Sequence, residues 1–460
     1  MNNVHSRRRF LAGAATFGFG AMILPRVGAT TYQANERANI ALVGCGGRGR
    51  WFAQLIPRIN ENFVALCDVD EREAANTYKQ LPDVPKYRDF REMLSERDKQ
   101  IDAVIVATPD NTHAVVAMAA IRAGKHVYVE KPLTHDVYES RALREAATKH
   151  GVATQMGNQG TASSDLRRGV DLIRAGVLGE IREVHVYNSG CGSGPRPLPE
   201  GSEPVPPELE WDLWLGPAAW RPYNVAWMRW HTWRDFGTST LGGWATHSAN
   251  LAFMALKVDS LWHDAQADGR PPRIRVRAEA SGYHKHTHPR SARITYEIPA
   301  RGELPPLPFV CHMGGTSYQE LMQRIRKAGL DENAGAPNAR RFTPHAGCLI
   351  VGTEGMLYAI AHNTRITLLP EAKFKDLKEP ERHLPKSRGH EREWLDAARG
   401  GPAAMSNFDY SSPLNEFLML GNVATLYDRQ IEYDPIACQC VGDDEATAAL
   451  RREYREAWTL

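Results

Sequence analysis

From residue 39 onward, short apolar runs alternate with more polar, amphipathic stretches. Asn39–Val43 is largely apolar, as in a buried parallel strand, and Arg50–Ile59 after it is amphipathic. The alternation continues with apolar runs at Phe63–Cys67, Ala103–Ala107 and His126–Val129. Strands that alternate with helices predict an α/β fold, and we expect a Rossmann-type dinucleotide-binding domain over residues 36–156.

The first thirty residues follow a different pattern. Ser6-Arg7-Arg8-Arg9-Phe10-Leu11 precedes a weakly apolar run, Ala12–Leu24, and the small residues Val27-Gly28-Ala29. Charged, apolar and small-residue regions in this order are typical of an export signal, and residues 1–30 resemble a twin-arginine signal. The alternatives are a chance basic N-terminus or a transmembrane helix, for which the run is short. We expect a periplasmic protein exported by the twin-arginine pathway, with no membrane span in the mature chain.

A glycine-rich loop directly follows the first predicted strand. It reads Gly44-Cys45-Gly46-Gly47-Arg48-Gly49 and leads into the amphipathic stretch. Gly44 permits a tight turn, Gly46 lets the backbone approach a pyrophosphate, and Gly49 permits close packing of helix on strand. The helix N-terminus then faces the anion. Strand, loop and helix together predict a dinucleotide site that includes Gly44, Gly46, Gly47, Arg48 and Gly49.

An acidic residue ends the second predicted strand. Asp68 follows Phe63–Cys67 and lies about 20 residues beyond the loop, where an acid binds a ribose 2′-hydroxyl. A carboxylate there repels a 2′-phosphate, so NAD is favoured over NADP. The alternative is that Asp68 caps the next helix, and the two roles are compatible.

Polar residues also follow the later predicted strands. In an open parallel sheet, ligands bind outside the carboxyl ends of the strands. Asn111 is additionally a plausible N-cap for a helix that extends to Ala123. We assign to the cofactor site the residues at these strand ends, namely Thr108, Asn111, His113, Glu130 and Lys131.

Three segments together resemble the Gfo/Idh/MocA family of nicotinamide-dependent oxidoreductases: GCGGRG at 44–49, ATPDNTH at 107–113 and VEKPL at 129–133. Further segments resemble a bacterial branch of this family that commonly carries twin-arginine signals: Trp211–Pro217, Trp233–Thr238, Gly389–Trp394, Ser406–Tyr410 and Leu420–Ala424.

This resemblance implies a second, α+β domain over residues 157–435, for substrate binding and oligomerisation, with a large and mostly antiparallel sheet. Strand-like runs at Arg293–Ile298, Cys348–Val351 and Arg365–Leu369 are consistent with that sheet. A final segment, 436–460, is expected to pack on the body. Family members associate through the sheet, which implies a homodimer or homotetramer.

The resemblance also implies the catalytic residues. Lys131 is the catalytic lysine, and a lysine in a partly desolvated cleft can move a hydroxyl proton. The family's second element is an Asp and a His four residues apart on a helix. Here His247 matches the histidine, but Gly243 stands at the Asp position and Asn250 where a later Asp is frequent. Either Lys131 and His247 suffice, or another acid such as Asp235 approaches, or the reaction is unusual or lost.

Tryptophans are concentrated in the middle of the chain. Eight of the 11 lie between Trp211 and Trp262. Flat aromatic faces suit sugar rings, although core packing or a subunit contact explains most of these residues more simply. We assign to the substrate site Asn158, Trp233, Arg234, His247 and Asn250.

A possible metal pattern is present at His284, His286 and His288, which alternate along the chain. On a strand they would share one face. No Cys or carboxylate accompanies them, so we favour a solvated strand end or loop and predict no metal.

The charge balance bears on the partners. The chain carries a net charge of +2, and the four arginines of residues 1–30, with no acids, leave 2 − 4 = −2 for the remainder. A near-neutral body argues against nucleic acid as a partner.

Three functions remain open at this stage. The first is an oxidoreductase for a carbohydrate, polyol or sugar derivative. The second is an NAD-dependent glycoside hydrolase that works by transient oxidation and elimination. The third is a non-catalytic, cofactor-bound sugar-binding protein. Because free nicotinamide is not readily recycled outside the cytoplasm, an exported enzyme is expected to hold its cofactor tightly.

Overall fold

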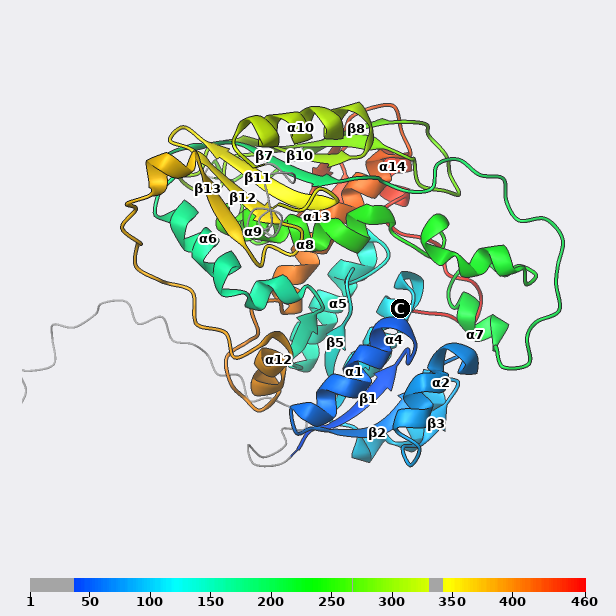
Figure 1. Cartoon of the computed structure of the whole chain (residues 1–460). Coiled ribbons are helices and arrows are strands. Elements are labelled where there is room, and N and C mark those ends of the chain that lie inside the picture. The colour runs from blue at the N-terminus through cyan, green and yellow to red at the C-terminus, as the bar shows by residue number, and fades with distance from the viewer. Residues whose placement is uncertain (1–36, 267, 331–341) are drawn as a thin grey trace, which may run out of the picture.

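The computed structural model describes residues 37–266, 268–330 and 342–460. Two β-sheets are separated by a layer of helices, and a further helix covers the outer side of the second sheet (Figure 1). The predicted export signal lies outside the described residues.

Six parallel strands form the first sheet, in the order β3-β2-β1-β4-β5-β6. The strands β4 and β5 are buried at every position, as continuous apolar runs predict. The predicted strands of this domain match observed strands to within one residue at each end. The bounds are β1 (Asn39–Val43), β2 (Asn62–Cys67), β3 (Lys86–Tyr87), β4 (Ala103–Val106), β5 (His126–Val129) and β6 (Thr154–Met156).

Helices connect these strands: α1 (Gly47–Arg58), α2 (Glu71–Gln80), α3 (Phe90–Glu96), α4 (Asp110–Arg122) and α5 (Val137–His150). The prediction that Asn111 caps α4 is wrong. That helix begins at Asp110, so its cap position, Pro109, lies two residues earlier than predicted. The Asn111 side chain donates instead to the carbonyl of Leu215 at 3.1 Å.

Nine strands form the second sheet, in the order β13-β12-β11-β7-β10-β9-β8-β14-β15. Only the β7–β10 pair among these described strands is parallel, so the prediction of a mostly antiparallel sheet is confirmed. The bounds are β7 (Ile181–Asn188), β8 (Ile274–Ala280), β9 (Ala292–Ile298), β10 (Leu307–Met313), β11 (Ala346–Gly352), β12 (Met356–Ile360), β13 (Ile366–Leu369), β14 (Ile431–Asp434) and β15 (Gln439–Cys440).

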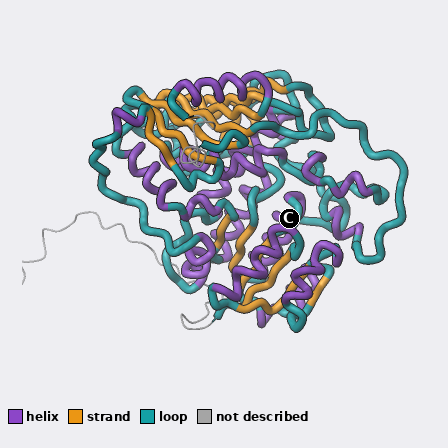
Figure 2. The backbone as a smooth tube through the Cα atoms, in the orientation of Figure 1, coloured by secondary structure: helices purple, strands orange, loops and turns teal. Residues whose placement is uncertain are grey.

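A long excursion separates β7 from β8. After β7, a long loop over residues 189–210 extends away from the second sheet and leads to α7 (Figure 2). The excursion then contains α7 (Trp211–Leu215), 3₁₀ turns at Val225–Met228 and Trp230–Thr232, a π-helix at Leu241–Ala245, α8 (Thr246–Ser248), α9 (Asn250–Ala255) and a 3₁₀ turn at Val258–Trp262. Five of its tryptophans are buried among apolar side chains: Trp211, Trp214, Trp227, Trp233 and Trp262.

The remaining elements bind the two sheets into one body. They are 3₁₀ turns at Asp98–Gln100, Gln159–Ala162 and Glu371–Phe374, with α6 (Ser164–Arg174), α10 (Gly315–Lys327), α12 (His390–Ala398), α13 (Phe408–Ala424) and α14 (Asp444–Ala448). α13 packs against α5 between the sheets, and a continuous apolar core reaches from one sheet to the other through them. α12 packs on the Rossmann sheet, where the Trp394 and Tyr128 rings lie 5.6 Å apart.

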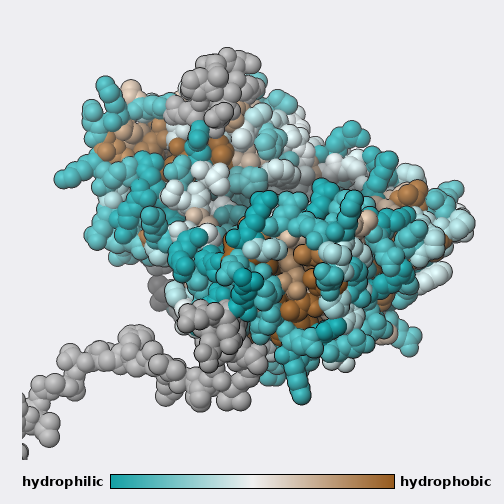
Figure 3. Space-filling view, turned by 60° about the horizontal axis from the view of Figure 1, so that its bottom comes forward, coloured by the Kyte–Doolittle hydropathy of each residue, from teal (hydrophilic) through white to brown (hydrophobic). Residues whose placement is uncertain are grey.

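The molecular surface is mainly hydrophilic on the face that shows the Rossmann end, with hydrophobic residues gathered in small patches (Figure 3). Among the described residues, no helix has the length and apolar character needed to cross a membrane.

Candidate active site

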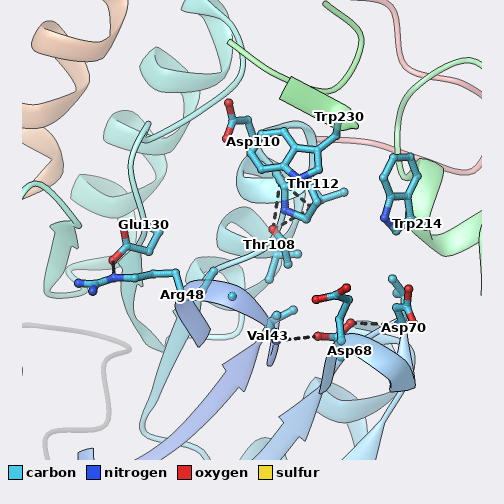
Figure 4. A pocket seen from close by; sticks show the side chains of 18 of the residues that line it. Val43, Arg48, Asp68, Asp70, Thr108, Asp110, Thr112, Glu130, Trp214 and Trp230 are labelled. Atoms are coloured by element: carbon cyan, nitrogen blue, oxygen red, sulfur yellow. Dashed lines mark hydrogen bonds and ion pairs between the residues drawn. The ribbon is translucent and has the colours of Figure 1, made fainter. Parts of the chain in front are cut away.

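A cleft of about 700 Å³ lies at the carboxyl ends of the Rossmann strands. Its walls come from four parts of the chain: the Rossmann loops, the excursion between β7 and β8, the turn between β12 and β13, and the C-terminal segment. Figure 4 shows side chains from the strand ends facing Trp214 and Trp230 of the excursion. A cleft at this edge of a parallel sheet is where such folds bind ligands.

The glycine loop adopts the predicted geometry. Gly44 has φ +86°, and a Cβ there would lie 2.5 Å from the carbonyl oxygen of Ala107. A Cβ at Gly49 would lie 1.9 Å from the carbonyl oxygen of Gly44. α1 has no side-chain cap and no acidic residue in its first turn, so its N-terminus suits a phosphate group. This arrangement fits the pyrophosphate of a dinucleotide.

Asp68 lies across the loop from this helix. Its Oδ2 accepts hydrogen bonds from the amides of Cys45 (2.6 Å) and Gly46 (3.3 Å), and its Oδ1 accepts from the amide of Asp70 (3.0 Å). Burial raises the pKa of Asp68 to about 6, against the effect of these amides. The alternative that Asp68 caps α2 is wrong, because Asp70 is the cap and accepts from the amide of Arg72 at 3.0 Å.

At the Asp68 end of the cleft, the guanidinium of Arg88 forms ion pairs with protein carboxylates. Arg88 lines the cleft and pairs with Glu71 at 2.8 Å and Glu210 at 2.5 Å. Each of its three nitrogens therefore donates to a carboxylate, and the acidic Asp68 lines the same cleft. Both features favour NAD, whose ribose carries hydroxyls, over NADP.

Not all of the residues assigned to the cofactor site line the cleft. Thr108 does, and its hydroxyl accepts from that of Thr112 at 2.8 Å. Asn111 and His113 do not. They are buried behind the cleft, and the His113 ring bridges the carbonyls of Pro132 (2.7 Å) and Thr108 (2.9 Å). These two side chains therefore position the loops, whereas Asp110 and Thr112 of the same helix face the cleft.

Glu130 and Lys131 line the opposite end of the cleft. Glu130 Oε1 accepts from Arg48 Nε at 2.9 Å and from Gln159 Nε2 at 3.1 Å. The Arg48 guanidinium also lies 3.7 Å from the ring centroid of Trp51. Lys131 Nζ donates to the carbonyl of Gly243 at 2.9 Å, which joins the Rossmann domain to the π-helix.

His247 lines the same end of the cleft, on the helix that follows the π-helix. Its ring lies 4.4 Å from that of His362, and its Nδ1 has no hydrogen-bond partner among the described residues. Burial, together with the nearby charge of Lys131, holds the pKa of His247 well below its usual value. The imidazole is therefore neutral near pH 7 and has a lone pair available.

Two further histidines in the cleft were not found from the sequence. His362 lies in the turn between β12 and β13, and His231 lies in a 3₁₀ turn of the excursion. Burial lowers the pKa of both. No local motif marks either residue, because each reaches the cleft only through the packing of the second domain.

The Asp of the expected catalytic relay is absent here. Gly243 lines the cleft, and a Cβ added to it would meet nothing within 4 Å. Asp235, the alternative acid, does not supply the missing carboxylate: it pairs with Arg221 and is not among the residues that line the cleft. The described residues thus place Lys131 and His247 together without the relay acid.

Four residues predicted at the substrate site are structural instead. Trp233 packs against Trp227 in a buried cluster, with ring centroids 4.8 Å apart. Arg234 is buried and donates to the carbonyls of His284 (3.0 Å), Thr287 and Asn422. None of these lies at the wall of the cleft.

The asparagines of this prediction are buried as well. Asn250 donates to Thr161 Oγ1 at 2.8 Å and accepts from the Tyr410 hydroxyl at 2.6 Å. Asn158 accepts from the Ser406 hydroxyl. The walls are formed instead by Trp214, Trp230, Trp244 and Met228. Sequence alone does not distinguish a tryptophan that faces the cleft from one that faces the core.

The three alternating histidines do not converge. The rings of His284 and His286 lie 5.7 Å apart, whereas His288 is buried and bonds to the carbonyl of Gly237. Within the described ranges, no group of three or more His, Cys, Asp or Glu side chains could hold a metal ion.

The cleft, with its glycine loop, uncapped helix and acid, corresponds to a known type of domain. Residues 38–158 match the sequence model of the Gfo/Idh/MocA oxidoreductase family, described as an NAD-binding Rossmann fold. This region is therefore similar in sequence to the NAD-binding domain of that family. Among relatives, scyllo-inositol 2-dehydrogenase (NAD(+)) of Bacillus subtilis (strain 168) is 40% identical over 150 residues, which is 32% of this chain and 42% of that protein.

A glycoside hydrolase is also among the proteins with a similar sequence. Glycosyl hydrolase family 109 protein 2 of Shewanella sp. (strain ANA-3) is 28% identical over 156 residues, which is 32% of this chain and 34% of that protein. The chain therefore matches less than half the length of these curated relatives.

Solved structures resemble this chain in fold well beyond residues 38–158. A levoglucosan dehydrogenase in complex with NADH has a TM-score of 0.52 at 16% identity, over 86% of this chain and 99% of that one. The WlbA dehydrogenase from Bordetella pertussis, in complex with NADH and UDP-GlcNAcA, has a TM-score of 0.53 at 16% identity, over 86% and 98%. These structures share the overall architecture of the chain.

Proposed function

We propose that this protein is an NAD-dependent oxidoreductase that acts on a carbohydrate, polyol or sugar derivative. One observation carries the proposal: Lys131 and His247, from different domains, line one end of a cleft whose other end holds the glycine loop and Asp68. A proton-transfer pair and a dinucleotide site thus share a single cavity. Inositol dehydrogenases are among the relatives of this chain, which supports this class of substrate.

When bound, the nicotinamide ring supplies the hydride acceptor or donor. The chain's own residues then handle the hydroxyl proton. His247 lines the cleft and its imidazole is neutral, so it can accept that proton. Lys131 has three donors, of which the Gly243 carbonyl takes one, so the others can hold the substrate oxygen.

The walls of this end suit a ring-shaped, hydroxylated substrate. Trp230 and Trp244 line the cleft together with polar groups of Gln159 and the histidines. An indole face packs against the apolar face of a sugar ring, while the polar groups bond its hydroxyls.

Substitution of Lys131 tests the proposal directly. The purified protein is tested for bound nucleotide and then for changes in nicotinamide absorbance with a panel of sugars and polyols. We expect K131A to lower kcat by about 100-fold or more, while the Kd for NAD stays within about twofold of wild type. K99A, at an exposed lysine, is the matched control. Full turnover by K131A would contradict the assignment.

The second candidate is an NAD-dependent glycoside hydrolase. The glycosyl hydrolase family 109 relative favours it. Release of aglycone from aryl glycosides, without net reduction of nicotinamide, would select this function over the first. Binding of sugar without either reaction would select the third possibility, a non-catalytic sugar-binding protein, which the empty Gly243 position favours.

We further propose export through the twin-arginine pathway, on the basis of the Arg7-Arg8-Arg9 segment and the apolar run after it. Replacing all three arginines by lysine should leave the protein in the cytoplasm, as fractionation would show. An unchanged periplasmic location would contradict the proposal. We also propose a homodimer or homotetramer, because the resemblance to the Gfo/Idh/MocA family implies association through the second sheet. Light scattering of the purified protein tests this proposal, and a monomer would contradict it.

A further inference from the structure

At one end of the cleft, Trp458 supplies part of the wall. Trp458 lines the cleft, is only 8% exposed, and its ring lies 6.2 Å from that of Phe90, the first residue of α3. The guanidinium of Arg91 lies 4.9 Å from the same ring. This is the Asp68 side of the cleft, since the amide of Asp68 donates to the carbonyl of Tyr87, just before α3, at 3.0 Å.

The segment that carries Trp458 is anchored on the N-terminus of α5. Arg452 pairs with the buried carboxylate of Glu139 at 2.7 Å, and its amide donates to Asp136 Oδ2 at 3.2 Å. The Tyr454 hydroxyl donates to Glu139 Oε1 at 2.6 Å. A buried carboxylate that receives several charged or polar donors is a strong attachment point.

The same C-terminal segment also forms hydrogen bonds with α7, in the excursion between β7 and β8. Arg455 donates to the carbonyl of Gly216 and to the carboxylate of Asp212, each at 2.6 Å, and so ties down α7. The carbonyl of Leu460 accepts from Arg122, at the end of α4, at 3.0 Å. Figure 1 marks the C-terminus beside α4, between the two sheets.

Trp458 therefore shares its side of the cleft with residues of α7. Leu213 and Trp214 line the cleft too, and Trp214 is itself stacked on Trp211 with ring centroids 4.9 Å apart. None of these side chains belongs to the Gfo/Idh/MocA domain of residues 38–158. The acid that binds the adenosine ribose marks this side as the adenosine half of a dinucleotide site.

We propose that Trp458 is a nucleotide-binding residue, and that residues 452–460 retain the dinucleotide by closing its adenosine half together with α7. The inference rests on the proposed function. An aromatic wall suits the flat face of a purine, and the segment is held at α3, α4, α5 and α7, so the indole is fixed in place at the wall before a nucleotide binds. On this proposal, the docked residues 452–460 contribute to retention of the dinucleotide in addition to the Rossmann loops.

The test compares dissociation of nucleotide from full-length wild type and variants. We expect W458A to raise the dissociation rate and the Kd about tenfold for both NAD and ADP-ribose, with W458F intermediate. ADP-ribose is used because it lacks the nicotinamide ring and reports on the adenosine half. W220A, at a tryptophan that is 65% exposed and does not line the cleft, is the matched control and should match wild type.

The outcomes separate the two proposals. In the first outcome, the wild-type protein binds NAD, but W458A and W458F release NAD at the wild-type rate although circular dichroism shows that both are folded. This outcome refutes the role of Trp458 and leaves the proposed function standing. A loss of affinity for NAD but not for ADP-ribose would refute the placement at the adenosine half. Wild-type protein that binds neither nucleotide would overturn both proposals.

Discussion

At the scale of single residues, Asp68 shows how a fold tunes a ligand-binding group. Its carboxylate accepts hydrogen bonds from three backbone amides, which favour the ionised form. Burial nevertheless raises the pKa of Asp68 to about 6. The ionised form is the better acceptor for ribose hydroxyls, and this form is lost as the pH falls through 6.

Binding of NAD should therefore weaken in mild acid. Each unit of pH below about 6 is expected to lower the affinity about tenfold, because binding must then remove a proton from Asp68. Titration calorimetry between pH 5 and 8 measures this dependence. D68N should bind NAD about tenfold more weakly at pH 8 and lose most of the pH dependence. A wild-type affinity that is flat down to pH 5 would contradict the prediction.

Gly243 is the other informative residue, since its position is open and adjoins both Lys131 and His247. G243D adds a carboxylate at a position where a Cβ has no neighbour within 4 Å. An anion near His247 should raise the pKa of its imidazole, which burial and Lys131 now hold low. The acid limb of the pH–rate profile should therefore move to higher pH, whereas G243N, of equal size and no charge, should leave it in place.

At the scale of elements, the close approach of α1 to the glycine loop couples packing to binding. Gly49 lets the helix lie against the loop, since a Cβ there would meet the Gly44 carbonyl at 1.9 Å. We expect G49A to lower the melting temperature and to abolish measurable NAD binding, because the helix N-terminus must shift away from the pyrophosphate.

The control for this element is a glycine of the loop after β7. A Cβ at Gly190 would meet nothing within 4 Å, and the residue does not line the cleft. G190A should keep wild-type stability and NAD affinity, as thermal melts and calorimetry would show. Retained NAD binding in G49A would show that the close approach is not required.

At the scale of the whole molecule, a buried ion pair joins the two domains. Glu416 of α13 is fully buried and pairs with Arg141 of α5 at 3.0 Å. It also accepts from Trp262 Nε1 at 2.6 Å and from the Tyr433 hydroxyl at 2.9 Å. One carboxylate thus connects α5 of the Rossmann domain to three parts of the second domain.

Neutralising that carboxylate leaves the Arg141 charge buried without its partner. E416Q is expected to lower the free energy of unfolding by about 3 kcal/mol or more. E354Q removes an exposed pair with Lys373 and should cost less than about 1 kcal/mol. Urea unfolding measures both values, and equal small effects for the two variants would contradict the role of Glu416.

Local pattern alone determined the Rossmann half of this protein. The strand runs, the loop Gly44–Gly49, Asp68 and Lys131 lie where the sequence predicts, because strand ends of a parallel sheet share one edge. These features depend on residues close together in the chain.

Only the tertiary structure decided which other side chains reach the cleft. Trp233 and Arg234 point into the second domain's interior, whereas His362, Trp214 and Trp458 line the cleft. Each of these comes from a segment far from the Rossmann loops in sequence. The direction in which its side chain faces depends on how the excursion, the second sheet and the C-terminus pack together, and no local pattern of residues encodes that packing.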